Sequence, residues 1–224
     1  PYATKLVDRI LTMSATNDVA GVREVQLDCD WTKTTQEKCF AFMAEVRRLL
    51  AGHGIEMSST IRLHQLSSEA PPAGRGVLMC YNTGAVRSSD TGNSILSSAD
   101  VAPYARNLKK YALPLDLAYP AFDWAVWFRD DEFCALLRAA DPSDPHLTQV
   151  KDNIYKVTES FYQERNYLIY GDIVRFEFSD FDQITEVKNL LEPQLGDHSV
   201  ILYHLDSSKL SKFTPDEISY IYGR

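Results

Sequence analysis

The chain has 224 residues, and its 45% hydrophobic and 24% charged residues are typical of a folded domain rather than a disordered segment. The formal net charge of −8 argues against a nucleic-acid partner held through phosphate contacts. No apolar run approaches the length of a membrane span, and the chain is long enough for one sizeable core.

Apolar periodicity predicts alternating helices and strands along the first half of the chain. Helices are expected over residues 2–17, 35–51 and 98–111, and strands over 22–31, 57–66, 77–81 and 113–119. The polar loops at 67–76 and 82–97 contain Ser and Gly, and the second of them is expected to be mobile.

The second half begins with a dense group of aromatic residues over 121–129. Helices are then expected over 130–140 and 144–165, a strand over 173–178, a helix over 181–193 and a strand over 199–205. Thr214-Pro215-Asp216-Glu217 is typical of a helix start, with a capping Thr and a Pro at the first position. The alternation predicts an α/β fold with parallel strands, in one domain over 1–224.

The stretch from Val25 to Thr32 carries polar side chains at the end of a predicted strand. Alternation places Asp28, Asp30 and Thr32 on one face and apolar residues on the other. Carboxylates on the face of an apolar strand need cations, hydrogen bonds or a polar cavity. This face is therefore a candidate site.

Leu27-Asp28-Cys29-Asp30-Trp31 resembles the signature of family 18 glycoside hydrolases, the chitinases and endo-β-N-acetylglucosaminidases. That signature reads Asp-x-x-Asp-x-Asp-x-Glu. Its second and third Asp correspond to Asp28 and Asp30, its first Asp to Val25, and its catalytic Glu to Thr32. The motif is therefore present without its proton donor.

Further segments resemble the same family in the right order. Residues 77–82 are similar to the sixth-strand Met-x-Tyr-Asp, with Tyr81 kept and Asn82 in place of Asp. Residues 117–122 resemble Gly-x-Pro-x-Tyr, with Phe122 for Tyr, and residues 199–206 resemble Gly-x-x-x-Trp-x-x-Asp, with Tyr203 for Trp and Asp206 kept. The resemblance implies a (β/α)8 TIM barrel of which the chain covers about strands four to eight. The first three strands would precede residue 1, whether they were removed or belong to another chain.

The resemblance also implies roles for individual residues. Family 18 enzymes use the acetamido group of the substrate as the nucleophile, so Asp30 would orient this group, Asp28 would support Asp30, and Tyr81 would donate a hydrogen bond. Thr32 cannot supply the proton that the lost Glu would give. The substrate-binding candidates are Asn82, Phe122, Trp124, Tyr203 and Asp206. No metal or cofactor is implied.

Three alternatives stay open from the sequence. The barrel can bind an N-acetylglucosamine-containing glycan, a glycoprotein or another protein partner without efficient hydrolysis. It can be an active hydrolase with a relocated acid, for which Asp116, Glu177 and Asp206 are candidates. It can also be a structural subunit without a sugar site, in which the acids are paired internally and Arg62 is expected to contact Asp28.

The four cysteines form no CxxC pair, so a zinc site is not expected, and they do not reveal the compartment. Analogy with family 18 suggests a secreted, cell-surface or periplasmic protein. The sequence names neither the sugar, the partner nor the oligomeric state.

Overall fold

A computed structural model describes residues 2–223 of the chain. The fold is mixed α/β and divides into two compact units. Unit 1 extends to Met79 and also contains Tyr104–Leu117 and Pro193–Ser199; unit 2 contains Cys80–Pro103, Ala118–Glu192 and the residues from Val200 onward. Among residues 2–223, every helix is too short or too polar to cross a membrane.

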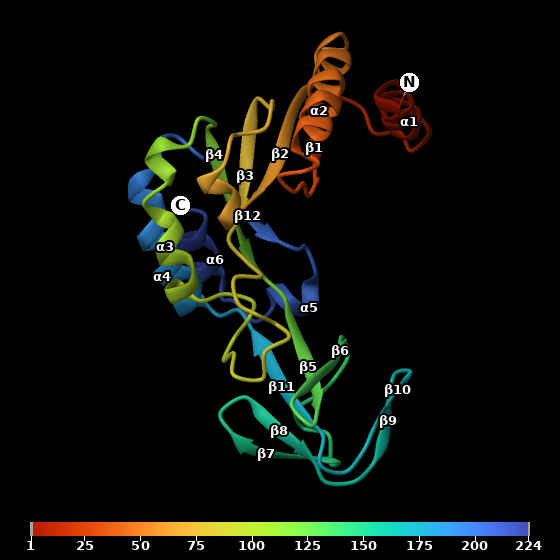
Figure 1. The fold of residues 1–224 in the computed structure, drawn as a ribbon, viewed down its shortest axis with the longest axis vertical. Coiled ribbons are helices and arrows are strands. Elements are labelled where there is room, and N and C mark those ends of the chain that lie inside the picture. Colours follow the sequence, from red (N-terminus) through yellow and green to blue (C-terminus); the bar gives the residue numbers. More distant parts are fainter. Residues whose placement is uncertain (1, 224) are drawn as a thin grey trace. The chain divides into compact units, whose positions relative to one another are not determined.

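Two helices open unit 1 and pack against each other (Figure 1). They are α1 (Tyr2–Thr16) and α2 (Gln36–Ala51). Met43, Val46 and Leu50 form the fully buried stripe of α2. The Thr35 side chain at the start of α2 accepts a hydrogen bond from the Thr32 amide and makes no capping hydrogen bond with the helix.

The parallel strands of unit 1 are β1 (Glu24–Leu27), β2 (Glu56–Arg62) and β3 (Arg75–Met79). Their registers run from Glu24 opposite Glu56 and from Ser58 opposite Arg75, so the predicted parallel pairing is confirmed. The strand expected over 57–66 ends early, at Arg62. A 3-10 helix, η1 (Leu63–Ser67), follows because the Gln65 side chain accepts a hydrogen bond from the Arg62 amide and closes a turn.

Two further strands continue this sheet in the order β1-β2-β3-β4-β12. They are β4 (Leu115–Pro120) and β12 (Val200–Tyr203). Backbone amides near the two ends of β3, residues 76 and 80, donate to carbonyls 114 and 118 along β4. Amides 117 and 121 along β4 donate in the same way to carbonyls 199 and 203 along β12. In both pairs the residue numbers rise together, so the strands run in parallel. The helix α3 (Ser98–Ala105) and the 3-10 helix η2 (Leu108–Lys110) lie between β3 and β4 in the sequence.

Unit 2 contains a second, antiparallel sheet where helices were expected. Its strands, in the order β6-β5-β11-β8-β7, are β5 (Asp123–Arg129), β6 (Glu132–Leu137), β7 (Leu147–Lys151), β8 (Ile154–Val157) and β11 (Ile173–Phe178) (Figure 1). A separate hairpin joins β9 (Phe161–Gln163) to β10 (Asn166–Leu168). The predicted helices over 130–140 and 144–165 are therefore wrong.

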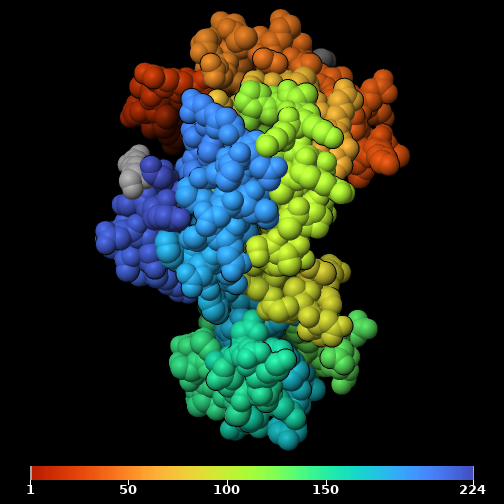
Figure 2. All heavy atoms as spheres, turned by 90° about the vertical axis from the view of Figure 1, so that its left-hand side faces the viewer, coloured from red at the N-terminus to blue at the C-terminus, as the bar shows by residue number. Residues whose placement is uncertain are grey.

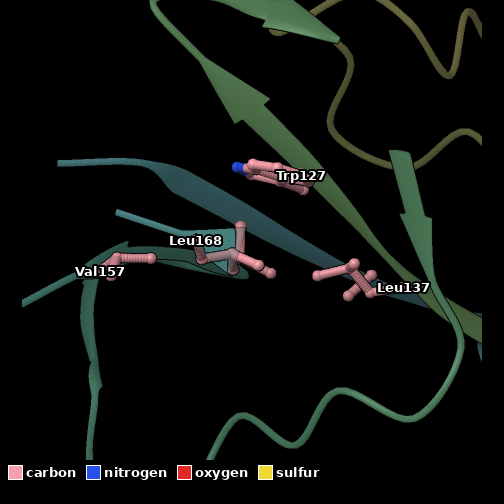
Figure 3. Close-up of a cluster of buried hydrophobic side chains, with 6 residues drawn as sticks. Trp127, Leu137, Val157 and Leu168 are labelled. Atoms are coloured by element: carbon pink, nitrogen blue, oxygen red, sulfur yellow. The ribbon is translucent and has the colours of Figure 1, made fainter. Parts of the chain in front are cut away.

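Tight turns explain this correction. Asp130, Asp131, Asp152 and Glu164 all have positive φ angles between 40° and 62°, which a right-handed helix does not allow. The strands bury one side against a shared apolar cluster that contains Trp127, Leu137, Val157 and Leu168 (Figure 3). Residues of five different strands meet there, so the cluster depends on pairing that local periodicity does not encode.

The remaining helices of unit 2 begin at well-defined caps. In α4 (Phe181–Leu191) the Asp180 side chain accepts from the Gln183 amide, and in α6 (Pro215–Ile221) Thr214 accepts from Glu217, as predicted. A short α5 (Ser207–Leu210) also belongs to this unit, and the 3-10 helix η3 (Glu192–Gln194) follows α4 directly in the sequence. Figure 2 shows α4 beside the start of α3, where the Ser98 hydroxyl donates to Glu186 at 2.8 Å.

The loop over 82–97 is tied to the antiparallel sheet. The Arg175 guanidinium donates to the carbonyls of Ser88 at 2.7 Å and Val86 at 3.1 Å. The Asn93 amide donates to the Phe178 carbonyl at 2.7 Å. The loop was expected to be mobile because of its Ser and Gly residues, and in the structure side chains and carbonyls of β11 hold it in place.

Candidate functional site

The polar residues after β1 form the segment 28–32, here called the acidic segment, which lies in unit 1. The strand ends at Leu27, earlier than predicted, yet the alternation persists: Asp28, Asp30 and Thr32 are exposed, while Trp31 is buried. The Trp31 ring packs edge-on against Phe40 of α2, with centroids 5.3 Å apart. This contact holds the segment against the helix and leaves its two carboxylates facing solvent.

Each carboxylate of the acidic segment has a partner on β2. The Thr60 hydroxyl donates to Asp28 at 2.6 Å. Arg62 binds Asp30 with two nitrogens, Nε to Oδ1 and Nη2 to Oδ2, the latter at 2.8 Å. The sequence suggested Arg62 as a partner for these acids, and the structure identifies Asp30 as the one it pairs with.

The exposure of this ion pair limits its strength. The Asp30 side chain is 66% exposed and that of Arg62 is 32% exposed. Ion pairs in such surroundings contribute about 1 kcal/mol or less. A ligand that bonds to Asp30 therefore competes with a weak contact.

Thr32 stands among other hydroxyl groups at the position of the lost Glu. Its Oγ1 lies 2.9 Å from Thr34 Oγ1 and 3.2 Å from Thr35 Oγ1. A hydroxyl group keeps its proton far above neutral pH, so this trio cannot protonate a leaving oxygen. The chemistry available here is hydrogen bonding rather than acid catalysis.

Four of the predicted aromatic residues meet in unit 2. Tyr81 stacks on Tyr203 with centroids 5.2 Å apart and planes at 11°, and Phe122 packs edge-on against both rings. Trp124 touches Phe122 at 5.3 Å, and its indole nitrogen donates to Glu177 at 2.8 Å. Tyr81 is buried, whereas Tyr203 is 48% exposed. We call these four residues, with His204, the aromatic cluster.

His204 belongs to the aromatic cluster although the sequence gave no reason to select it. Its ring stacks on Phe122 at 6.4 Å and meets Tyr203 at 5.5 Å. Strand alternation would separate two consecutive residues, but β12 ends at Tyr203, so His204 lies beyond the strand. Thr60 was likewise missed as a partner of Asp28, although it shares a predicted strand face with Arg62.

Two other predicted site residues have structural surroundings. Asn82 is exposed and has a φ angle of 55°, a left-handed conformation that Asn tolerates better than most residues. Asp206 caps α5, where its carboxylate accepts from the Ser208 amide at 2.8 Å and hydroxyl at 2.6 Å. These hydrogen bonds lower the pKa of Asp206, so it stays ionised where a general acid would need its proton.

The other candidate replacement acids are also held by internal contacts. Asp116 accepts from Arg75 at 2.8 Å and from the Ser199 amide at 2.6 Å. Glu177 is fully buried and accepts from Arg175 at 2.6 Å, from the Ser94 amide at 2.9 Å and from Trp124. Both carboxylates are therefore occupied by donors within the protein.

An open pocket of about 730 Å³ lies elsewhere in unit 2. Loop residues from Gly84 to Asp100 and the α4 residues Gln183 and Glu186 line it. The residues of the aromatic cluster are not among those that line it. Within unit 2, this pocket and the aromatic cluster are therefore separate features.

The predicted site residues fall into two groups that belong to different units. Asp28, Asp30 and Thr32 lie in unit 1, whereas Tyr81, Asn82, Phe122, Trp124, Tyr203 and Asp206 lie in unit 2. Each group is internally organised, the first by β2 and α2 and the second by ring contacts. The catalytic and binding roles assigned to these residues remain predictions.

No known family model matches the chain, and no curated protein matches it. Solved structures do resemble it. The spore cortex-lytic enzyme SleL of Bacillus cereus is 15% identical, with a TM-score of 0.54 over 94% of this chain and 53% of that chain. SleL of Bacillus megaterium QM B1551 is 12% identical, with a TM-score of 0.58 over 98% of this chain and 52% of that chain.

A Group IV chitinase of Ostrinia furnacalis is 10% identical, with a TM-score of 0.55 over 100% of this chain and 74% of that chain. At such low identity these similarities establish the fold alone. The fold is therefore chitinase-like, and the chain spans about half the length of the two SleL enzymes.

Proposed function

We propose that this protein binds N-acetylglucosamine-containing glycan without efficient hydrolysis, through a family-18-like barrel that has lost its general acid. In this proposal β1, β2, β3, β4 and β12 correspond to barrel strands four to eight. In unit 1, Asp30 orients the acetamido group and Asp28 supports it. A glycoprotein is the form of partner that would present such a glycan.

One observation supports the proposal: Thr32, at the position of the catalytic Glu, carries a hydroxyl group that cannot serve as a general acid. Thr32 is surrounded by hydroxyl groups, and the three carboxylates that could substitute for it are each held by internal hydrogen bonds. General acid catalysis contributes roughly 10²–10⁴-fold to such reactions. Because sugar leaving groups are poor, losing this contribution nearly abolishes turnover.

The first prediction concerns Thr32→Glu, which returns the acid to its family position. We expect wild-type protein to bind an N-acetylglucosamine oligosaccharide, measured by calorimetry, and to release no fragments detectable by mass spectrometry after long incubation. Thr32→Glu is expected to release fragments at a rate at least about 10²-fold above wild type. Thr32→Gln is the matched control, because glutamine has nearly the same shape as glutamate but its amide group cannot act as an acid.

Two outcomes would contradict the proposal. Fragments from wild-type protein at a rate close to that of Thr32→Glu would show that an acid exists elsewhere. Absence of binding by wild type and both variants would favour a structural subunit, the alternative that the Arg62–Asp30 pair supports. The weakness expected of that exposed pair is the reason that we prefer the binding function.

A further inference from the structure

Two cysteines flank the exposed part of the acidic segment. Cys29 lies between Asp28 and Asp30, and Cys39 lies in the first turn of α2, ten residues further along. Both are partly buried free thiols. The Cys39 thiol donates to the buried Met43 at 3.8 Å, which directs it toward the buried face of α2. Cys29 shares a face of its segment with the buried Trp31, which packs on the same helix, so both thiols face the contact between the segment and α2, although the proposed function uses neither.

Independent contacts keep the two cysteines together. Trp31, two residues after Cys29, and Phe40, the residue after Cys39, stack edge-on at 5.3 Å. The Thr35 carbonyl accepts from the Cys39 amide at 2.9 Å, and the Thr32 carbonyl accepts from the Thr35 amide at 3.0 Å. The chain between the cysteines is thus already folded into a closed turn.

We propose that Cys29 and Cys39 are a modification site that forms a reversible disulfide when the protein meets a low-molecular-weight disulfide. The bond covalently joins the acidic segment to α2 and encloses Asp30 and Thr32 in a small ring. This inference does not rest on the proposed glycan binding. A disulfide requires sulfurs about 2.05 Å apart, closer than a hydrogen bond, so one segment must shift slightly. Cys29 follows the end of β1, outside regular structure, and can make that shift.

The chemistry proceeds by two exchanges. The Cys29 thiolate attacks one sulfur of the reagent disulfide and expels the first reagent thiolate, which leaves a mixed disulfide. The Cys39 thiolate then attacks the Cys29 sulfur and expels the second. The two cysteines lose two electrons and two protons, and the reagent gains them to become two thiols.

The other cysteines supply internal controls. Cys134 is exposed, so it can form a mixed disulfide and reports that the reagent is active. Cys80 is completely buried, so its modification would report unfolding. Burial raises the pKa of Cys29 and Cys39, which makes their thiolates scarce at neutral pH, and the incubation is therefore run at mildly alkaline pH.

The experiment incubates the full chain with oxidised glutathione and maps the thiols by peptide mass spectrometry without reduction. We expect a peptide cross-linked between Cys29 and Cys39 that carries no glutathione, an adduct on Cys134, and unmodified Cys80. Cys39→Ser is expected to keep glutathione on Cys29, because nothing can expel it, whereas Cys134→Ser is expected to form the same cross-link as wild type.

Thermal unfolding gives a second measurement. A ring of this size constrains the unfolded chain, so the cross-linked protein is expected to unfold roughly 5 °C or more above the reduced protein. The proposal is overturned if Cys134 reacts while Cys29 and Cys39 stay reduced. It is equally overturned if either of these two retains glutathione in the wild-type protein. Neither outcome bears on glycan binding.

Discussion

Glu177 shows how the same residue type can serve very different purposes. The sequence marked it as a candidate acid because it lies near a strand end. In the structure its carboxylate joins Arg175 of β11, Trp124 of β5 and Ser94 of the 82–97 loop. It is thus the connection between the loop and the antiparallel sheet, and its charge is matched by a guanidinium that is equally buried.

We predict that Glu177→Gln destabilises the protein by about 3 kcal/mol, because it leaves the buried Arg175 without its counter-charge. The free energy of unfolding in urea measures this loss. Glu159→Gln is the control, since Glu159 is exposed and its replacement is expected to change stability by about 0.5 kcal/mol or less. Equal effects of the two substitutions would contradict a structural role for the buried pair.

Some secondary-structure elements are determined by residues close in the sequence, and others by partners far away in it. The helix α2 and the caps of α4 and α6 depend on neighbouring residues, so the sequence predicted these helices with nearly the right bounds. The hairpins of unit 2 depend on positive-φ turns and on partners such as β5 with β11. Their apolar residues were interpreted as helical, because short runs carry little periodicity.

Strand β3 depends on the absence of a side chain at Gly76. A β-carbon there would lie 2.7 Å from Leu115 Cδ2 and 2.8 Å from Ile61 Cγ1, on either neighbouring strand. We predict that Gly76→Ala destabilises the protein by about 1–3 kcal/mol, as overpacking does. Gly196→Ala is the matched control, because its β-carbon would meet nothing within 4 Å.

Urea unfolding of both alanine variants tests this packing argument. Gly196→Ala is expected to be neutral or to stabilise the protein by a few tenths of a kcal/mol, since alanine restricts the unfolded chain. A stability of Gly76→Ala equal to that of wild type would mean that β3 can move away from its neighbours at little cost.

The stability of the whole chain is expected to fall in acid. At Asp172, burial raises the pKa, but Arg129, the Ile169 amide and Trp127 together outweigh it and hold the pKa below its usual range. At Asp123, burial also raises the pKa, but the hydrogen bonds and positive charges of Lys209 and Lys212 outweigh it, so the pKa is lowered. A carboxyl group with a lowered folded pKa contributes stability above its unfolded pKa of about 3.9 and loses it as pH falls through the folded value.

We therefore predict that the free energy of unfolding is nearly constant from about pH 7 to about pH 5 for these groups and declines below about pH 4. Urea titrations at a series of pH values measure this slope. Asp172→Asn is expected to be less stable than wild type at neutral pH and to show a shallower decline in acid. An unchanged slope in this variant would exclude Asp172 as a source of the acid sensitivity.

By itself, the sequence determined the α/β pattern, the parallel strands, the capped helices and the solvent-facing alternation of the acidic segment, because these can be inferred from local patterns along the chain. It also selected four of the five residues of the aromatic cluster. Only the tertiary structure decided the antiparallel sheet, the pairing of Arg62 with Asp30 and the burial of Glu177. Each of these depends on contacts between residues far apart in the sequence, such as Phe128 with Ile173 and Asp30 with Arg62, and which distant partners meet is decided by competition among all packings of the chain.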